Sequence, residues 1–163
     1  MKNKKYKLMI FDADGTLRFC TIPGQPCPNK PDEWKLLKNV KEKLSKFEWG
    51  SPAEGKTAYG IASNQGGVGV GYFSSEMAFR LLKDTFMAAF GFKPINEVIQ
   101  MCIPKPEEKP ECRKPRPGML KKIMQFWQIP PSETLFVGDM ESDKLTAENA
   151  GCDFMWAKDF FRF

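Results

Sequence analysis

Short apolar runs and segments of helical periodicity alternate along the chain. Each run is short and nearly continuous, which is typical of a strand buried on both faces of a parallel sheet. The runs are 6–11, 57–62, 97–102, 134–137 and 153–157. The clearest helical period begins at Ser74 or Ser75 and ends at Gly91, with apolar side chains at 77, 81, 82, 86 and 90.

Further helices are predicted between the runs. They are a helix from an Asp32 cap through Trp34 to Phe47, and helices over 118–127 and 143–150. Prolines make the segments 21–31 and 103–117 irregular loops. Strands that alternate with helices form parallel crossovers, so the pattern predicts a three-layer α/β fold. We expect a central parallel sheet of about five strands in a single domain, residues 1–163.

Composition narrows the class of protein. The chain is 42% hydrophobic and 28% charged, which suits a globular domain with its own core. No run approaches the roughly 20 apolar residues that span a bilayer, so we expect no membrane partner. The five cysteines are an odd number at irregular spacing, which favours a reducing cytoplasmic location over a disulfide framework. We also expect a monomer.

Histidine is absent, and the net charge is +5. The absence of histidine excludes Ser-His-Asp and Cys-His catalysis as well as histidine-ligated zinc. Any acid or base must therefore be a carboxylate, lysine, cysteine or tyrosine. The positive charge favours anionic partners, because the summed field attracts negative ligands.

Polar clusters follow the predicted strands at the points where they end. The clusters are 12–16 (DADGT), 63–65 (SNQ) and 138–139 (GD). Ligands of an open parallel sheet bind at the carboxyl ends of its strands, so we expect these clusters to converge. Asp12, Asp14, Asp139 and Asp143 would then share a small volume, where like charges require a cation. Mg²⁺ is the natural occupant, because it prefers carboxylate oxygens, water and phosphate.

These motifs resemble those of the haloacid dehalogenase-like (HAD) phosphatase superfamily, subfamily IIIA. Residues 12–17 (DADGTL) match its first motif, in which a nucleophilic Asp is followed by a second Asp, Gly and Thr. Ser63 matches the second motif, Lys114 the third, and Asp139 with Asp143 the fourth. The resemblance implies a Rossmann-like HAD fold, here without a large cap domain.

The resemblance also implies roles for the acidic residues. Asp12 would be the nucleophile that forms an aspartyl phosphate, and Asp14 would protonate the leaving oxygen and then activate water. Mg²⁺ would be held by Asp12, the backbone carbonyl of Asp14 and Asp139, with Asp143 orienting the surrounding ligands.

Other matching residues would bind the transferring phosphoryl group. Lys114, Ser63 and Asn64 would hold its oxygens as charge develops on them, and Thr16 would assist binding. Taken alone, Ser63 could instead be an ordinary helix cap or turn residue, and Lys114 a solvated surface lysine.

Two longer stretches resemble the heptose bisphosphate and histidinol-phosphate phosphatase branch. They are 63–68 (SNQGGV) and 112–120 (CRKPRPGML). This resemblance implies that Arg113 and Arg116 grip a second anionic group, since guanidinium pairs bidentately with phosphate. An alternative is that both arginines only solubilise a charged loop.

The chain departs from this branch at its zinc site. Relatives often bind zinc through a Cys-x-His pair and a Cys-x-Cys pair, but only Cys102 and Cys112 remain here. Because a stable tetrahedral site needs four ligands, we expect no structural zinc. Cys20, Cys27 and Cys152 are interpreted as ordinary buried or loop thiols.

A second resemblance concerns the substrate. The 3′-phosphatase domains of polynucleotide kinase-phosphatases share the same motifs, and Lys2, Lys4 and Lys5 could contact a phosphate backbone. We place a small phosphorylated metabolite ahead of a nucleic-acid 3′ end. A phosphate-binding scaffold with an inactive site is the non-enzyme alternative.

Overall fold

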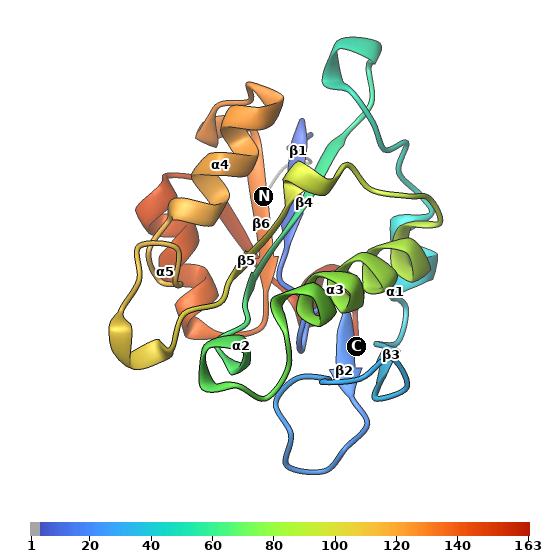
Figure 1. Ribbon diagram of the computed structural model, residues 1–163. Coiled ribbons are helices and arrows are strands. Elements are labelled where there is room, and N and C mark those ends of the chain that lie inside the picture. The colour runs from blue at the N-terminus through green and yellow to red at the C-terminus, as the bar shows by residue number, and fades with distance from the viewer. Residues whose placement is uncertain (1–3) are drawn as a thin grey trace.

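The computed structural model describes residues 4–163, and a five-stranded parallel sheet lies at its centre (Figure 1). The order β5-β4-β1-β6-β7 places β1 in the middle, so the direction of the crossovers reverses beside it. The strands are β1 (Leu8–Phe11), β4 (Ala58–Asn64), β5 (Ile99–Cys102), β6 (Thr134–Gly138) and β7 (Asp153–Trp156). Every neighbouring pair is parallel, which confirms the predicted α/β sheet.

Helices cover both faces of this sheet (Figure 1). They are α1 (Val40–Leu44) and α3 (Ser75–Phe90) on one face, and α4 (Gly118–Trp127) and α5 (Glu141–Ala150) on the other. As predicted, α3 begins after Ser74, whose hydroxyl accepts a hydrogen bond from the Met77 N–H at 3.0 Å. It ends at Gly91, whose φ of 85° suits a residue without a side chain.

The remaining helical elements are short. They are α2 (Gly67–Val70), α6 (Ala157–Phe161), and the 3-10 turns η1 (Pro52–Glu54), η2 (Asn96–Val98), η3 (Pro106–Glu108) and η4 (Pro131–Glu133). Within residues 4–163, the connections between elements hold no large cap domain. No helix in this described range has both the length and the apolar character that a membrane span requires.

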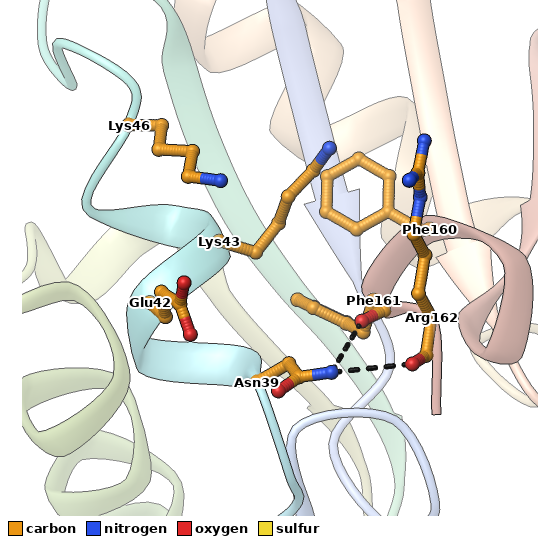
Figure 2. Close-up of a pocket in the computed structure, with 7 residues that line it drawn as sticks. All are labelled: Asn39, Glu42, Lys43, Lys46, Phe160, Phe161 and Arg162. Carbon is orange, nitrogen blue, oxygen red and sulfur yellow. Dashed lines mark hydrogen bonds between the residues drawn. The ribbon is translucent and has the colours of Figure 1, made fainter.

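The carboxyl-terminal segment closes the core on the face covered by α1. The ring centroids of Phe160 and Phe161 lie 5.6 and 6.1 Å from that of Phe11 in β1. The Asn39 side-chain amide donates hydrogen bonds to the carbonyl oxygens of Phe161 and Arg162 at 3.1 and 3.2 Å (Figure 2). The surface pocket in Figure 2 shares no lining residue with the pocket at the strand ends.

A two-stranded antiparallel hairpin occupies the place of the first part of a predicted helix. β2 (Arg18–Cys20) pairs with β3 (Trp34–Leu36). The helix predicted from Asp32 is therefore wrong as far as Asn39, whose left-handed φ of 67° directly precedes α1. The apolar residues before Asn39 suit a helix and a strand alike. Pairing with β2, which the sequence pattern did not identify, decides in favour of the strand.

One disulfide joins Cys102 at the end of β5 to Cys112. Irregular cysteine spacing argued against disulfides, and this pair is an exception. Its Cα atoms lie 5.4 Å apart because the loop between them returns to the sheet. Cys20, Cys27 and Cys152 are free thiols, as predicted. The absence of structural zinc stays a prediction.

Candidate active site

Carboxylates from separate strand ends meet in one small volume. Asp12 directly follows β1 and Asp139 directly follows β6. The Asp12 N–H donates to the Val137 carbonyl oxygen at 2.9 Å, so the two loops leave the sheet side by side. Asp12, Asp139 and Asp143 each place an oxygen within 4.8 Å of the others. The structure therefore brings these residues together, as the strand endings predict.

Gly15 and Gly138 make room for this cluster. Gly15 has a φ of 83°, and a Cβ at this position would collide with the Asp139 carboxylate. A Cβ at Gly138 would lie 2.5 Å from the Cβ of Asp143. A side chain at either position would fill the space in which the carboxylates face one another.

Lys114 enters the cluster from the loop between β5 and α4. Its ammonium donates to Asp12 Oδ1 and Asp143 Oδ1, each at 2.7 Å, and its exposed fraction is only 6%. Its backbone N–H donates to Asn64 Oδ1 at 3.1 Å, which ties the loop to the end of β4. The alternative of a solvated surface lysine is therefore wrong, because both the ammonium and the backbone are engaged at the site.

Asp143 is held by protein donors at both of its carboxylate oxygens. Oδ1 accepts from Lys114, and Oδ2 accepts from the backbone N–H groups of Asp139 and Met140 at 3.1 and 3.0 Å. These bonds form at the start of α5, where N–H groups lack partners inside the helix. Asp143 thereby fixes the loop that carries Asp139.

The electrostatics of the cluster favour an added cation. Burial raises the pKa of Asp12 well above its ordinary value, and Asp143 raises it further, while Lys114 opposes the rise. Burial also raises the pKa of Asp139. Burial alone would lower the pKa of Lys114, but Asp12 and Asp143 outweigh it and raise that pKa. Lys114 is one positive charge among several carboxylates, so the donor set fits a divalent cation such as Mg²⁺.

Asp14 is fixed by residues to which the sequence analysis gave no role. Arg18 Nε donates to Asp14 Oδ1 at 2.7 Å, and Gln65 Nε2 donates to Asp14 Oδ2 at 3.0 Å. Gln65 Nε2 also donates to Ser63 Oγ at 2.7 Å. Gln65 lies in the matched stretch 63–68, so the sequence did indicate that it is near the site. Arg18 carried no such signal, because nothing in the sequence indicates that an arginine beyond the first motif is buried.

The polar side chains open into a pocket of about 390 Å³. Asp12, Asp14, Ser63, Asn64 and Lys114 contribute to its lining. Apolar side chains also line it, namely Pro26, Val70, Pro106 and Met140.

The remaining predicted site residues lie at different distances from the carboxylate cluster. The buried Thr16 hydroxyl is 3.4 Å from an oxygen of Asp12 and from one of Asp139. Arg113 lines the pocket itself. Arg116 does not: its guanidinium contacts the Lys109 carbonyl oxygen and borders an adjoining pocket of about 320 Å³, which shares Arg113 and Lys114 with the first.

Known proteins are similar to this chain in sequence and in fold. The family described as Polynucleotide kinase 3 phosphatase matches residues 7–161. A D-glycero-beta-D-manno-heptose-1,7-bisphosphate 7-phosphatase of Pseudomonas putida is 30% identical over 142 residues, covering 84% of this chain and 74% of that protein. The histidine biosynthesis bifunctional protein HisB of Legionella pneumophila is 27% identical over 91% of this chain and 40% of its own length.

A solved structure of a related protein is also similar to this chain. The D,D-heptose 1.7-bisphosphate phosphatase from B. bronchiseptica, complexed with magnesium and phosphate, superposes with a TM-score of 0.73. It is 26% identical and covers 91% of this chain and 78% of that one. Since the family match extends over the entire sheet and its strand-end loops, this chain is a phosphatase of the polynucleotide kinase 3 phosphatase family, within the heptose bisphosphate and histidinol-phosphate branch of the HAD superfamily.

Proposed function

We propose that the chain is a Mg²⁺-dependent phosphomonoester hydrolase that works through an aspartyl phosphate on Asp12. Its substrate is a small phosphorylated metabolite of the sugar bisphosphate or histidinol phosphate type. The observation that carries this proposal is the position of Asp12, which is buried at the end of β1, lines the pocket and contacts Lys114 at 2.7 Å. A carboxylate so placed can reach phosphorus in a bound ester.

The reaction has two proton-balanced halves. In the first, a carboxylate oxygen of Asp12 bonds to phosphorus, the ester P–O bond breaks, and Asp14 gives a proton to the leaving oxygen. In the second, water attacks the same phosphorus and loses a proton to Asp14. The bond to Asp12 breaks, orthophosphate leaves, and both residues return to their starting protonation states.

The residues present fit a magnesium ion. Asp12, Asp139 and the backbone carbonyl of Asp14 would hold it, since Asp12 and Asp139 each place a carboxylate oxygen within 4.8 Å of the other. When bound, Mg²⁺ supplies positive charge that offsets the carboxylates and the phosphoryl oxygens. Asp143 supports this site by fixing the Asp139 backbone, because both of its oxygens already have protein donors.

Ser63, Asn64 and Lys114 would bind the transferring phosphoryl group. Ser63 Oγ accepts a hydrogen bond from Gln65, so its own hydroxyl hydrogen is free to be donated to a phosphoryl oxygen. Asn64 accepts a hydrogen bond from the backbone N–H of Lys114 and thereby helps to position the ammonium group in the site. Such preorganised donors stabilise charge that develops in the transition state.

Arg113 supports a substrate with a second anionic group. It lines the catalytic pocket, and a Cβ on the neighbouring Gly66 would lie 3.4 Å from its Nη1. A guanidinium at this wall can pair bidentately with a second phosphate. The names of the Pseudomonas and Bordetella relatives point to the same class of substrate.

A nucleic-acid 3′ end is the second candidate substrate. It is favoured by the description of the family that matches residues 7–161. Of the lysines predicted to contact a phosphate backbone, Lys2 lies outside the described residues, and Lys4 pairs with Asp153 at 2.9 Å. Lys5 is exposed, but Lys4 and Lys5 both precede β1 and so lie at the end of the strand opposite the pocket. The metabolite therefore remains the first candidate.

The test is a comparison of hydrolysis rates under identical Mg²⁺. Heptose bisphosphate, histidinol phosphate and a 3′-phosphorylated oligonucleotide are assayed with and without the metal. We expect Mg²⁺-dependent turnover that is fastest with one of the small esters. A preference for the oligonucleotide that weakens steeply with salt would reverse the order of the candidates. Phosphate binding without turnover of any ester would leave only the scaffold.

A further inference from the structure

Arg18 is a buried cation that the proposed chemistry does not yet use. Its side chain is 0% exposed, and it is one of the largest fully buried side chains between residues 4 and 163. A guanidinium in a protein interior is costly unless its N–H groups are paired. Its position therefore calls for specific partners.

The guanidinium is paired on two sides. Toward the site, Nε donates to Asp14 Oδ1 at 2.7 Å, and Nη2 donates to Asp14 Oδ2 at 3.4 Å. Away from the site, Nη1 donates to the Thr85 hydroxyl at 3.0 Å, and that hydroxyl donates to the Leu81 carbonyl oxygen at 2.7 Å within α3. Thr85 thus anchors the guanidinium to a long helix, and the guanidinium holds the Asp14 carboxylate.

The backbone reinforces this arrangement. The Gly15 N–H donates to the Arg18 carbonyl oxygen at 2.8 Å, which brings β2 back beside the first motif. Arg18 itself does not line the catalytic pocket, whereas Asp14 does. Arg18 can therefore act on the reaction only through Asp14.

The two oxygens of Asp14 are not equivalent in this geometry. Oδ1 accepts the short bond from Arg18 Nε at 2.7 Å, and a guanidinium N–H can only donate. Oδ2 has only the longer contacts, at 3.4 Å to Arg18 and 3.0 Å to Gln65. Oδ2 is therefore the less tightly held of the two oxygens and the one left for a further contact.

We propose that Arg18, anchored by Thr85, is a positioning residue that fixes the Asp14 carboxylate so that Oδ2 carries the proton to the leaving group. This inference rests on the proposed function. In the first half-reaction the Oδ2 proton moves to the leaving oxygen as the P–O bond breaks. In the second, Oδ2 takes a proton from the attacking water.

Substituted phenyl phosphates test this role, because their shape is nearly constant while the leaving group's need for a proton varies. 4-Nitrophenolate leaves readily without a proton, whereas unsubstituted phenolate does not. For Arg18→Gln, we expect the loss in kcat/KM to be larger with phenyl phosphate than with 4-nitrophenyl phosphate, by about tenfold or more. For Thr85→Val, we expect the same difference between the two substrates, but a smaller one. Arg80→Gln, an exposed arginine on the same helix, should show none.

A double-mutant cycle separates positioning from a structural role. In an Asp14→Asn background, adding Arg18→Gln should not change the leaving-group dependence further. Equal losses for all leaving groups, or a selective loss that persists without Asp14, would overturn the inference. If Arg18→Gln does not fold, Thr85→Val decides the question alone. Failure of the proposed function looks different, since the wild-type chain would then hydrolyse neither ester.

Discussion

The ammonium of Lys114 lies 2.7 Å from a carboxylate oxygen of Asp12, although 102 positions separate the two residues in the chain. The contact is nearly inaccessible to solvent, so the charge on Asp12 is stabilised chiefly by Lys114, and the charge on Lys114 by Asp12 and Asp143. The pair joins the loop after β5 to the end of β1. It thereby ties the loop between β5 and α4 to Asp12, the proposed nucleophile.

Asp12→Asn tests the nucleophile directly. The amide has nearly the same shape but cannot form the acyl phosphate, so we expect turnover of an aryl phosphate to fall at least about 10³-fold. Rapid quenching with labelled substrate should trap phosphate on the wild-type chain and not on the variant. Circular dichroism should show an unchanged fold. Undiminished turnover would remove Asp12 from the mechanism.

Lys114→Met removes the cation between Asp12 and Asp143. We expect kcat to fall by about 10²-fold or more, because charge on the phosphoryl oxygens loses a preorganised donor. The free energy of unfolding should fall by about 3 kcal/mol or more, since buried carboxylates lose their partner. Urea unfolding measures this change. Lys122→Met, at an exposed position of α4, is the matched control, and an equal effect there would contradict the assignment.

Asp139→Asn tests the magnesium site. Loss of one anionic ligand should raise the Mg²⁺ concentration needed for half-maximal activity by about tenfold or more. A second readout is independent of turnover: Mg²⁺ should raise the Tm of the wild-type chain and have less effect on the variant. Glu141→Gln, an exposed acid at the start of α5, is the control. Equal Mg²⁺ responses in both variants would place the ion elsewhere.

Tyr6→Phe tests a pH-dependent contact at the amino-terminal ends of the strands, opposite the active site. The Tyr6 hydroxyl donates to Asp153 Oδ2 at 2.6 Å, and this bond, with help from Lys4, lowers the pKa of Asp153. Burial and the same bond raise the pKa of Tyr6 to about 12. A carboxyl with a lowered pKa adds stability above its ordinary pKa, and this stability is lost as the pH falls through the folded value.

We therefore expect Tyr6→Phe to cost at most about 1 kcal/mol at pH 7, a small value because Asp153 is half-exposed. The difference from the wild type should shrink below about pH 4, as Asp153 becomes protonated in both states. Urea unfolding at several pH values measures this difference in the free energy of unfolding. Phosphatase activity should not change, and Tyr72→Phe at an exposed position is the control. A difference that stays constant down to pH 3 would assign the effect to packing alone.

Local pattern predicted most of the sheet. The continuous apolar runs identified all its strands, because a strand buried on both faces admits few polar side chains. The ends of those runs also located Asp12 and Asp139, since parallel strands end at one edge. Matching motifs also pointed to Asp14 and Ser63, which both line the pocket.

What the sequence could not determine depends on contacts between distant segments. Residues 34–36 suit a helix or a strand, and only pairing with β2 settles the choice. The Cys102–Cys112 bond and the position of Arg116 at an adjoining pocket both follow from the path of one loop. Burial is likewise a tertiary property: no local pattern distinguishes Arg18, enclosed between Asp14 and Thr85, from a solvated arginine such as Arg80. The spacing of apolar residues can be read from the sequence alone. A charged side chain, in contrast, can be buried only where the fold brings it a partner from a distant segment.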